Sequence, residues 1–153
     1  MIFKKIKKDK QNFDRNNTDE NKVLNAKYFS AYKGKLVIKM AGFYGRSFYL
    51  GAMFISPKET GDSKYSTDVV RHEYGHSKQI ERIGVIPYFF MIGIPSVFNR
   101  RVPVPDYYNL KTEITADLLG GVVRDSHTED AIQAGEKYLN KIEKAISPLR
   151  RSF

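Results

Sequence analysis

Two short apolar runs early in the chain follow the pattern of β-strands. Lys35–Met40 and Phe48–Ile55 are rich in β-branched, aromatic and aliphatic residues, and Gly42–Gly45 separates them. Such runs around a glycine-containing link predict two strands, either a hairpin or neighbours in a small sheet. At a sheet edge, the strand over 48–55 could pair with an extended peptide; otherwise it only supports the element that follows. Residues 23–33 signal ordered structure only weakly.

The apolar positions then change to a helical period. The series with this spacing consists of Val69, His72, His76, Ile80 and Ile83. It predicts a helix whose two histidines lie on the inward face. Residues Ser66–Asp68 can cap the start of this helix, and Gly84 can end it.

Two more helices are predicted towards the C-terminus. In Asp106–Val123 the residues on one face are Leu110, Glu113, Ile114, Asp117, Leu118 and Gly121. Two acids within an apolar stripe require a positive partner. Thr128–Ile146 is expected to pack through Ile132, Tyr138, Leu139, Ile142 and Ile146. Ser126 and Glu129 form a capping-box pattern before it, and Pro148 is expected to stop it.

The segment Ile83–Phe98 contains no charged residue. It is shorter than the roughly 20 residues that cross a bilayer, and glycines and prolines interrupt it. A buried wall of the domain or of a substrate pocket is the favoured interpretation, with an interfacial or re-entrant membrane contact and a true span as alternatives. Asn99–Pro105 is expected to be an extended connector.

These elements together predict an α+β fold. A small N-terminal β-sheet or hairpin is followed by a mainly helical part with the histidine-bearing helix and the acidic helix. Residues 1–22 are polar and basic and are expected to form a tail, with 23–153 as a single domain.

The charge balance adds one feature. The chain has 26 Lys and Arg against 17 Asp and Glu, a net charge of +9, with lysines crowded near the start. This charge favours acidic surfaces, but no base-reading motif is present, so nucleic acid is not expected as a partner. The start MIFKKIKKDK lacks the apolar region of a secretory signal. The location is left open between the cytoplasm, export by a leaderless route and release from a larger precursor.

The chemistry concentrates in the sequence His72-Glu73-Tyr74-Gly75-His76. Residues four apart lie on one face of a helix, so His72 and His76 can direct two ring nitrogens at one zinc ion. Glu73 lies beside that point and can act as a general base on water. This is the layout of a zinc peptidase.

A catalytic zinc usually takes a third protein ligand. The chain has no cysteine, which leaves His127, Glu113, Asp117 and Asp106 as the main candidates. Glu113 is favoured because it faces inward, and Asp117, one turn later, can hold a ligand histidine through a hydrogen bond. His127 is the main rival. Arg82 occupies the place where a metzincin would have its third histidine.

H-E-x-x-H followed by E-x-x-x-D resembles the gluzincins, the thermolysin-like zinc metallopeptidases. Residues 48–123 also look like small, poorly characterised bacterial zincin-like domains. The resemblance implies His72, His76 and Glu113 as zinc ligands, Glu73 as general base and Asp117 as their supporting acid. The gap between the motifs is longer than in thermolysin-like enzymes, and Thr112 stands where that family usually has asparagine.

No downstream histidine clearly matches the family's oxyanion-stabilising residue. The candidates for this role are Tyr107, Tyr108, Tyr88 and His127. A metalloendopeptidase acting on a peptide or protein is therefore the leading hypothesis. The alternative is a zinc-stabilised binding or membrane-interacting module without catalysis, with residues 83–98 as the membrane contact.

Overall fold

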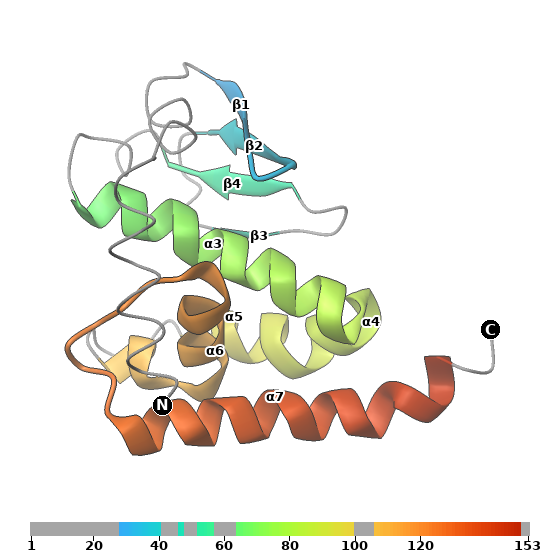
Figure 1. Ribbon diagram of the computed structural model, residues 1–153. Coiled ribbons are helices and arrows are strands. Elements are labelled where there is room, and N and C mark those ends of the chain that lie inside the picture. The colour runs from blue at the N-terminus through green and yellow to red at the C-terminus, as the bar shows by residue number, and fades with distance from the viewer. Residues whose placement is uncertain (1–27, 41–45, 48–51, 57–63, 100–105, 151–153) are drawn as a thin grey trace.

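The computed structural model describes residues 28–40, 46–47, 52–56, 64–99 and 106–150. In this part of the chain a small sheet precedes a mainly helical region, so the predicted α+β class is confirmed. The sheet lies on one side of helix α3, and helices α6 and α7 lie on the other (Figure 1). The bounds of these helices are Lys64–Ile83, Lys111–Gly120 and Glu129–Arg150. The tail predicted over residues 1–22 falls outside the described residues.

The sheet has the strand order β1-β2-β4-β3. The four strands are Phe29–Tyr32, Lys35–Lys39, Arg46–Ser47 and Met53–Ile55 for β1, β2, β3 and β4. Strands β1 and β2 form a hairpin whose turn residues, Lys33 and Gly34, both have positive φ, of 46° and 78°. Two successive positive φ angles are what a type I′ turn requires, and its twist matches that of the flanking strands.

Strands β2 and β4 are neighbours but run parallel. For the apolar runs, the sequence predicts either a hairpin or two neighbouring strands of a small sheet. The second arrangement is confirmed. The first is wrong, because the hairpin partner of β2 is β1. Strand β4 also lies inside the sheet, between β2 and β3, so the strand that leads to α3 is not an edge strand. It cannot pair with a substrate peptide through a free edge.

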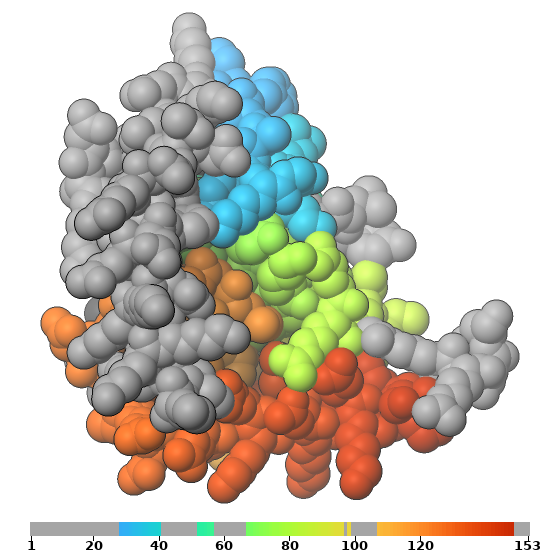
Figure 2. All heavy atoms as spheres, viewed as in Figure 1, coloured from blue at the N-terminus to red at the C-terminus, as the bar shows by residue number. Residues whose placement is uncertain are grey.

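Helix α3 contributes to two apolar clusters near its opposite ends. Near its start, Val69 and Val70 pack against sheet residues Tyr32, Val37, Met53 and Ile55. At its end, Ile83 joins Ile92 and the α7 residues Leu139, Ile142 and Ile146. Figure 2 shows the sheet resting on α3, with α7 on the opposite side. The helix ends where predicted, because Gly84 has φ 85° and turns the chain away.

Helices α3 and α6 touch through two glycines. A Cβ atom on Gly75 would lie 1.8 Å from the carbonyl oxygen of Ala116, and one on Gly120 would lie 2.0 Å from that of Arg71. No side chain fits at either position, so the two backbones are in direct contact. This contact fixes the register between the histidine-bearing helix and the acidic helix.

The single helix predicted over 106–123 is two elements. The 3-10 helix η4 (Asp106–Asn109) precedes α6, and extended Leu110 separates them. Helix α6 is buried on almost all sides, since α3 and α7 cover it, so its inward face is wider than the predicted stripe. Gly121 is exposed in a left-handed conformation, φ 79°, that ends the helix.

Helix α7 differs from its prediction at both ends. The hydroxyl of Thr128, not Ser126, accepts the hydrogen bond from the backbone of Ala131 that caps the start. Pro148 lies inside the helix, which continues to Arg150, so it does not act as a stop. Of the predicted apolar face, Ile132, Leu139, Ile142 and Ile146 are buried, whereas Tyr138 is only partly buried.

The uncharged segment is a chain of short helical pieces. Helix α4 (Val85–Tyr88), π-helix η3 (Phe89–Gly93) and helix α5 (Ile94–Asn99) follow one another directly. Ile92 is fully buried, as a wall of the domain requires, but several neighbours are exposed. Among the described residues, no helix is both long and apolar enough to cross a membrane. Of the predicted connector, 100–105 lies outside the described residues.

Candidate metal centre

Three buried side chains from α3 and α6 meet at one point. His72, His76 and Glu113 each offer a ligand atom, and these atoms lie within 4.8 Å of one another. Oε2 of Glu113 lies 3.2 Å from Nε2 of His72 and 3.4 Å from Nε2 of His76. Within the described residues, this group is the one that could hold a metal ion.

Asp117 fixes the orientation of the His72 ring. Its Oδ1 atom lies 2.7 Å from Nδ1 of His72, while Arg124 donates to both of its carboxylate oxygens. Burial alone would raise the pKa of Asp117, but His72 and Arg124 outweigh this effect and lower the pKa. An ionised carboxylate only accepts, so Nδ1 of His72 carries the hydrogen and Nε2 is directed at Glu113.

Gln79 fixes the His76 ring in the same sense. Its Nε2 donates to the carbonyl oxygen of Thr112 at 2.7 Å and to the hydroxyl of Thr115 at 2.6 Å. A carbonyl only accepts, so the amide oxygen of Gln79 must face Nδ1 of His76, 2.8 Å away. Nδ1 of His76 therefore donates, and its Nε2 is left for a ligand. The sequence prediction missed Gln79, although it follows His76 by three residues on the same helix face.

Glu113 is anchored through its other oxygen. Oε1 accepts a hydrogen bond from Ser96 of α5 at 2.6 Å, whereas buried Oε2 makes no hydrogen bond. With both rings neutral, two imidazole lone pairs and one carboxylate lone pair thus converge without a hydrogen between them. Only a positively charged species relieves this repulsion, and a His-His-Glu set is one that zinc takes in catalytic sites. The residues therefore fit a divalent metal.

The electrostatics of the cluster also favour positive charge. Burial would lower the pKa of His72, but Asp117 and Glu113 outweigh it and raise this pKa well above its usual value. The pKa of His76 is raised for the same reason, mainly by Glu113. Burial would raise the pKa of Glu113, yet the two histidines lower it well below its usual range. The negative charge that attracts a proton here equally attracts a metal cation.

The remaining predicted site residues lie around this cluster. Glu73 is buried, with 4% of its surface exposed. Its negative charge is close enough to raise the pKa of His76 and that of Tyr88. The Tyr88 ring meets His76 edge-on at 6.2 Å between centroids, and Tyr108 meets His72 at 5.7 Å. Tyr107 packs edge-on against Tyr108.

His127 lies outside the ligand group. Its Nε2 is 3.0 Å from the backbone carbonyl oxygen of Tyr108, to which it donates, and 3.5 Å from Asp117. The structure thus brings Glu113, and not its rival His127, to the two histidines. The side chain of Asp106 is outside the described residues.

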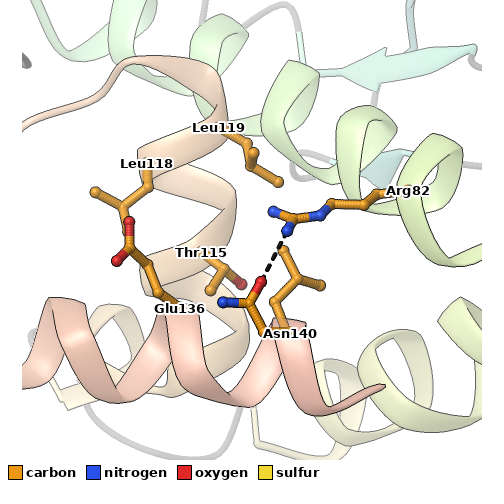
Figure 3. A pocket seen from close by; sticks show the side chains of 7 residues that line it. Arg82, Thr115, Leu118, Leu119, Glu136 and Asn140 are labelled. Carbon is orange, nitrogen blue, oxygen red and sulfur yellow. Dashed lines mark hydrogen bonds between the residues drawn. The ribbon is translucent and has the colours of Figure 1, made fainter. Parts of the chain in front are cut away.

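A separate pocket of about 200 Å³ opens between α3, α6 and α7 (Figure 3). Its lining consists of Arg82, Thr115, Leu118, Leu119, Glu136, Leu139 and Asn140. The guanidinium of Arg82 donates to Asn140 across it. None of the three metal-cluster residues lines this pocket. The pocket is connected to His76 only indirectly, because its lining residue Thr115 accepts a hydrogen bond from Gln79, which in turn bonds to His76.

Comparison of the chain with protein-family models, curated proteins and solved structures finds no match. The likeness to gluzincins therefore rests on the two motifs and on the buried His72, His76 and Glu113 cluster.

Replacing Gln79 with leucine is expected to weaken zinc binding by about 10–100-fold. Leucine removes the acceptor that holds Nδ1 of His76, so the ring loses its fixed orientation. Competition with a chromophoric chelator measures the affinity. Ser77→Ala is the matched control, because Ser77 is buried on the same helix and its hydroxyl donates only to the Glu73 backbone. Equal zinc affinity for Gln79→Leu and the parent would contradict the positioning role.

Proposed function

We propose that the protein is a zinc-dependent peptide hydrolase. The observation that carries the proposal is the convergence of His72, His76 and the otherwise unbonded Oε2 of Glu113, with Glu73 beside them. This donor set leaves room for water or substrate at a metal with three protein ligands. The H-E-x-x-H order supports it further, because the residue after the first histidine is placed to work on water.

In this proposal, His72, His76 and Glu113 would hold a zinc ion, which would supply the Lewis acidity needed to polarise a carbonyl and to lower the pKa of water. Asp117 and Gln79 keep the two rings in the tautomer that leaves Nε2 unprotonated. Glu73 accepts a proton from the attacking water and then delivers it to the leaving amine.

Tyr88 is the residue best suited to stabilise the developing oxyanion. Burial, followed by the negative charges of Glu73 and Glu113, raises the pKa of its phenol well above the usual value. The phenol therefore stays protonated and can donate a hydrogen bond near His76. Tyr108, beside His72, is the second candidate. The guanidinium of Arg124 stacks over its ring, with Cζ 3.8 Å from the ring centroid.

Removal of the metal tests the proposal. The purified chain is expected to contain close to one zinc per molecule, to cleave casein or a mixed peptide library, and to lose cleavage after dialysis against a chelator. Adding zinc back should restore it. Metal analysis and mass spectrometry of the cleaved peptides are the two measurements.

Glu113→Gln provides the matched variant, because its side chain keeps its shape but loses the negative charge that attracts the cation. It is expected to lose both zinc and cleavage. A parent protein that binds zinc tightly yet cleaves no peptide would support the non-catalytic, zinc-stabilised module instead.

A further inference from the structure

Two polar side chains interrupt the otherwise apolar segment 83–98, and both contact candidate metal ligands. Tyr88 and Ser96 are the only residues of this segment whose side chains can donate a hydrogen bond. The Tyr88 ring meets the His76 ring edge-on, and the Ser96 hydroxyl donates to Oε1 of Glu113. The uncharged segment therefore forms a wall of the metal centre, and its two polar groups are placed at two different ligands.

The bond from Ser96 to Glu113 has the geometry of a charge-assisted hydrogen bond. Its two oxygens are 2.6 Å apart, within the range of about 2.5–2.7 Å that is typical of a hydroxyl donating to a carboxylate. The hydroxyl of Thr112 also faces Oε1, but at 3.4 Å it lies beyond the usual range of such a bond. Glu113 is 0% exposed, so bulk water does not reach this oxygen. Ser96 is therefore the group that holds Oε1.

This bond gives the two oxygens of Glu113 different partners. Oε1 is held by Ser96, whereas Oε2 has no hydrogen-bond partner and lies 3.2 Å from Nε2 of His72 and 3.4 Å from Nε2 of His76. A carboxylate can bind a metal through one oxygen or through both. With Oε1 engaged, Glu113 offers one oxygen, and the site offers three ligand atoms. Three protein ligand atoms leave the fourth position of a tetrahedral zinc site to water or substrate.

The element that carries Ser96 is itself anchored. Ile92, one helical turn earlier, is fully buried in the apolar cluster with α7. Tyr138 of α7 donates its hydroxyl to the carbonyl oxygen of Met91 at 2.8 Å. Because its backbone is held in place, the Ser96 hydroxyl can fix the orientation of Glu113 instead of following it.

We propose that Ser96 is a positioning residue of the metal centre, which keeps Glu113 a one-oxygen ligand and thereby favours zinc over ions of higher coordination number. Mn²⁺ is such an ion, because it takes about six ligand atoms, mostly oxygens, and is favoured by a carboxylate that offers both of its own. This role depends on the metal binding of the proposed function, but not on its hydrolysis.

Ser96→Ala in the full chain tests the proposal. The substitution frees Oε1, so the affinity for Zn²⁺ is expected to fall about 10–100-fold, whereas the affinity for Mn²⁺ should fall less or rise. Competition with a chromophoric chelator measures both affinities, and circular dichroism checks that the variant keeps its helices. Ser77→Ala is the matched control, because this buried hydroxyl donates to the backbone of Glu73 and not to a ligand. Its affinities should remain those of the parent.

Co²⁺ reports the number of ligand atoms directly, because its visible absorption is strong in four-coordinate sites and weakens as ligands are added. The parent loaded with Co²⁺ should show the strong absorption, and Ser96→Ala a weaker one. If Ser96 served only to pack α5 against α6, its loss would lower the affinity for every ion alike and leave the spectrum unchanged.

Unchanged Zn²⁺ affinity in Ser96→Ala would overturn the inference, as would an equal loss for Zn²⁺ and Mn²⁺ with the Co²⁺ spectrum of the parent. A parent chain that binds none of the three ions would overturn both this inference and the proposed function. A parent that binds zinc and shows the Ser96→Ala effects, yet cleaves no peptide, would support the positioning role and contradict the hydrolase activity alone.

Discussion

Glu73→Gln is expected to slow peptide hydrolysis by about 10²–10⁴-fold while zinc remains bound. Glutamine has the shape of glutamate but cannot accept a proton from water. Glu73 is not one of the three residues whose ligand atoms converge, so the metal should not depend on it. Cleavage rate and zinc content are measured on the same preparation.

The matched control is Glu81→Gln, because Glu81 lies on the same helix but is exposed and pairs with Lys35 and Lys78. Its cleavage rate should remain that of the parent. A Glu73→Gln protein that cleaves as fast as the parent would show that the base lies elsewhere, even if zinc were present.

Gly75→Ala is expected to destabilise the protein by about 3 kcal/mol or more and to impair zinc binding. The added methyl group would overlap the carbonyl oxygen of Ala116, so α3 and α6 must separate. Because the histidines come from one helix and Glu113 from the other, separation also opens the ligand group. Urea denaturation with and without zinc measures both effects.

Gly93→Ala serves as the control, since the nearest atom to its Cβ would be 3.7 Å away, an ordinary contact. Its stability should change little. If Gly75→Ala unfolded at the same urea concentration as the parent, the direct backbone contact between α3 and α6 would be wrong.

The helical half of the fold was predictable because its apolar residues repeat with the helical period. The positions from Val69 to Ile83 on α3 and the isoleucines of α7 are buried as that period requires. The convergence of Glu113 with the two histidines was predictable too, because an acid in an apolar stripe needs a positive partner. The roles in catalysis remain predictions.

Other features depend on contacts that one sequence does not reveal. Strand β1 is defined by its hairpin with β2, while only one of its four residues, Tyr32, is buried, so its apolar signal is weak. Gln79 belongs to no recognised sequence motif. Its orientation depends on a hydrogen bond to the backbone carbonyl of Thr112 on α6, 33 residues later in the sequence. Pro148 fits within a helix that is anchored by Ile142 and Ile146, which outweigh its local tendency to break one.

The position of α3 between two apolar clusters limits how a bulky ligand gains entry. The helix that bears both histidines is tied to the sheet near its start and to α7 at its end, so it is poorly placed to move aside. Segment 85–99 directly follows Gly84, whose φ is 85°, and it is held to α7 by buried Ile92 and by the hydrogen bond from Tyr138 to the carbonyl oxygen of Met91. Since Ser96 of this segment donates to Glu113, a displacement of the segment would be felt directly at the candidate metal ligands.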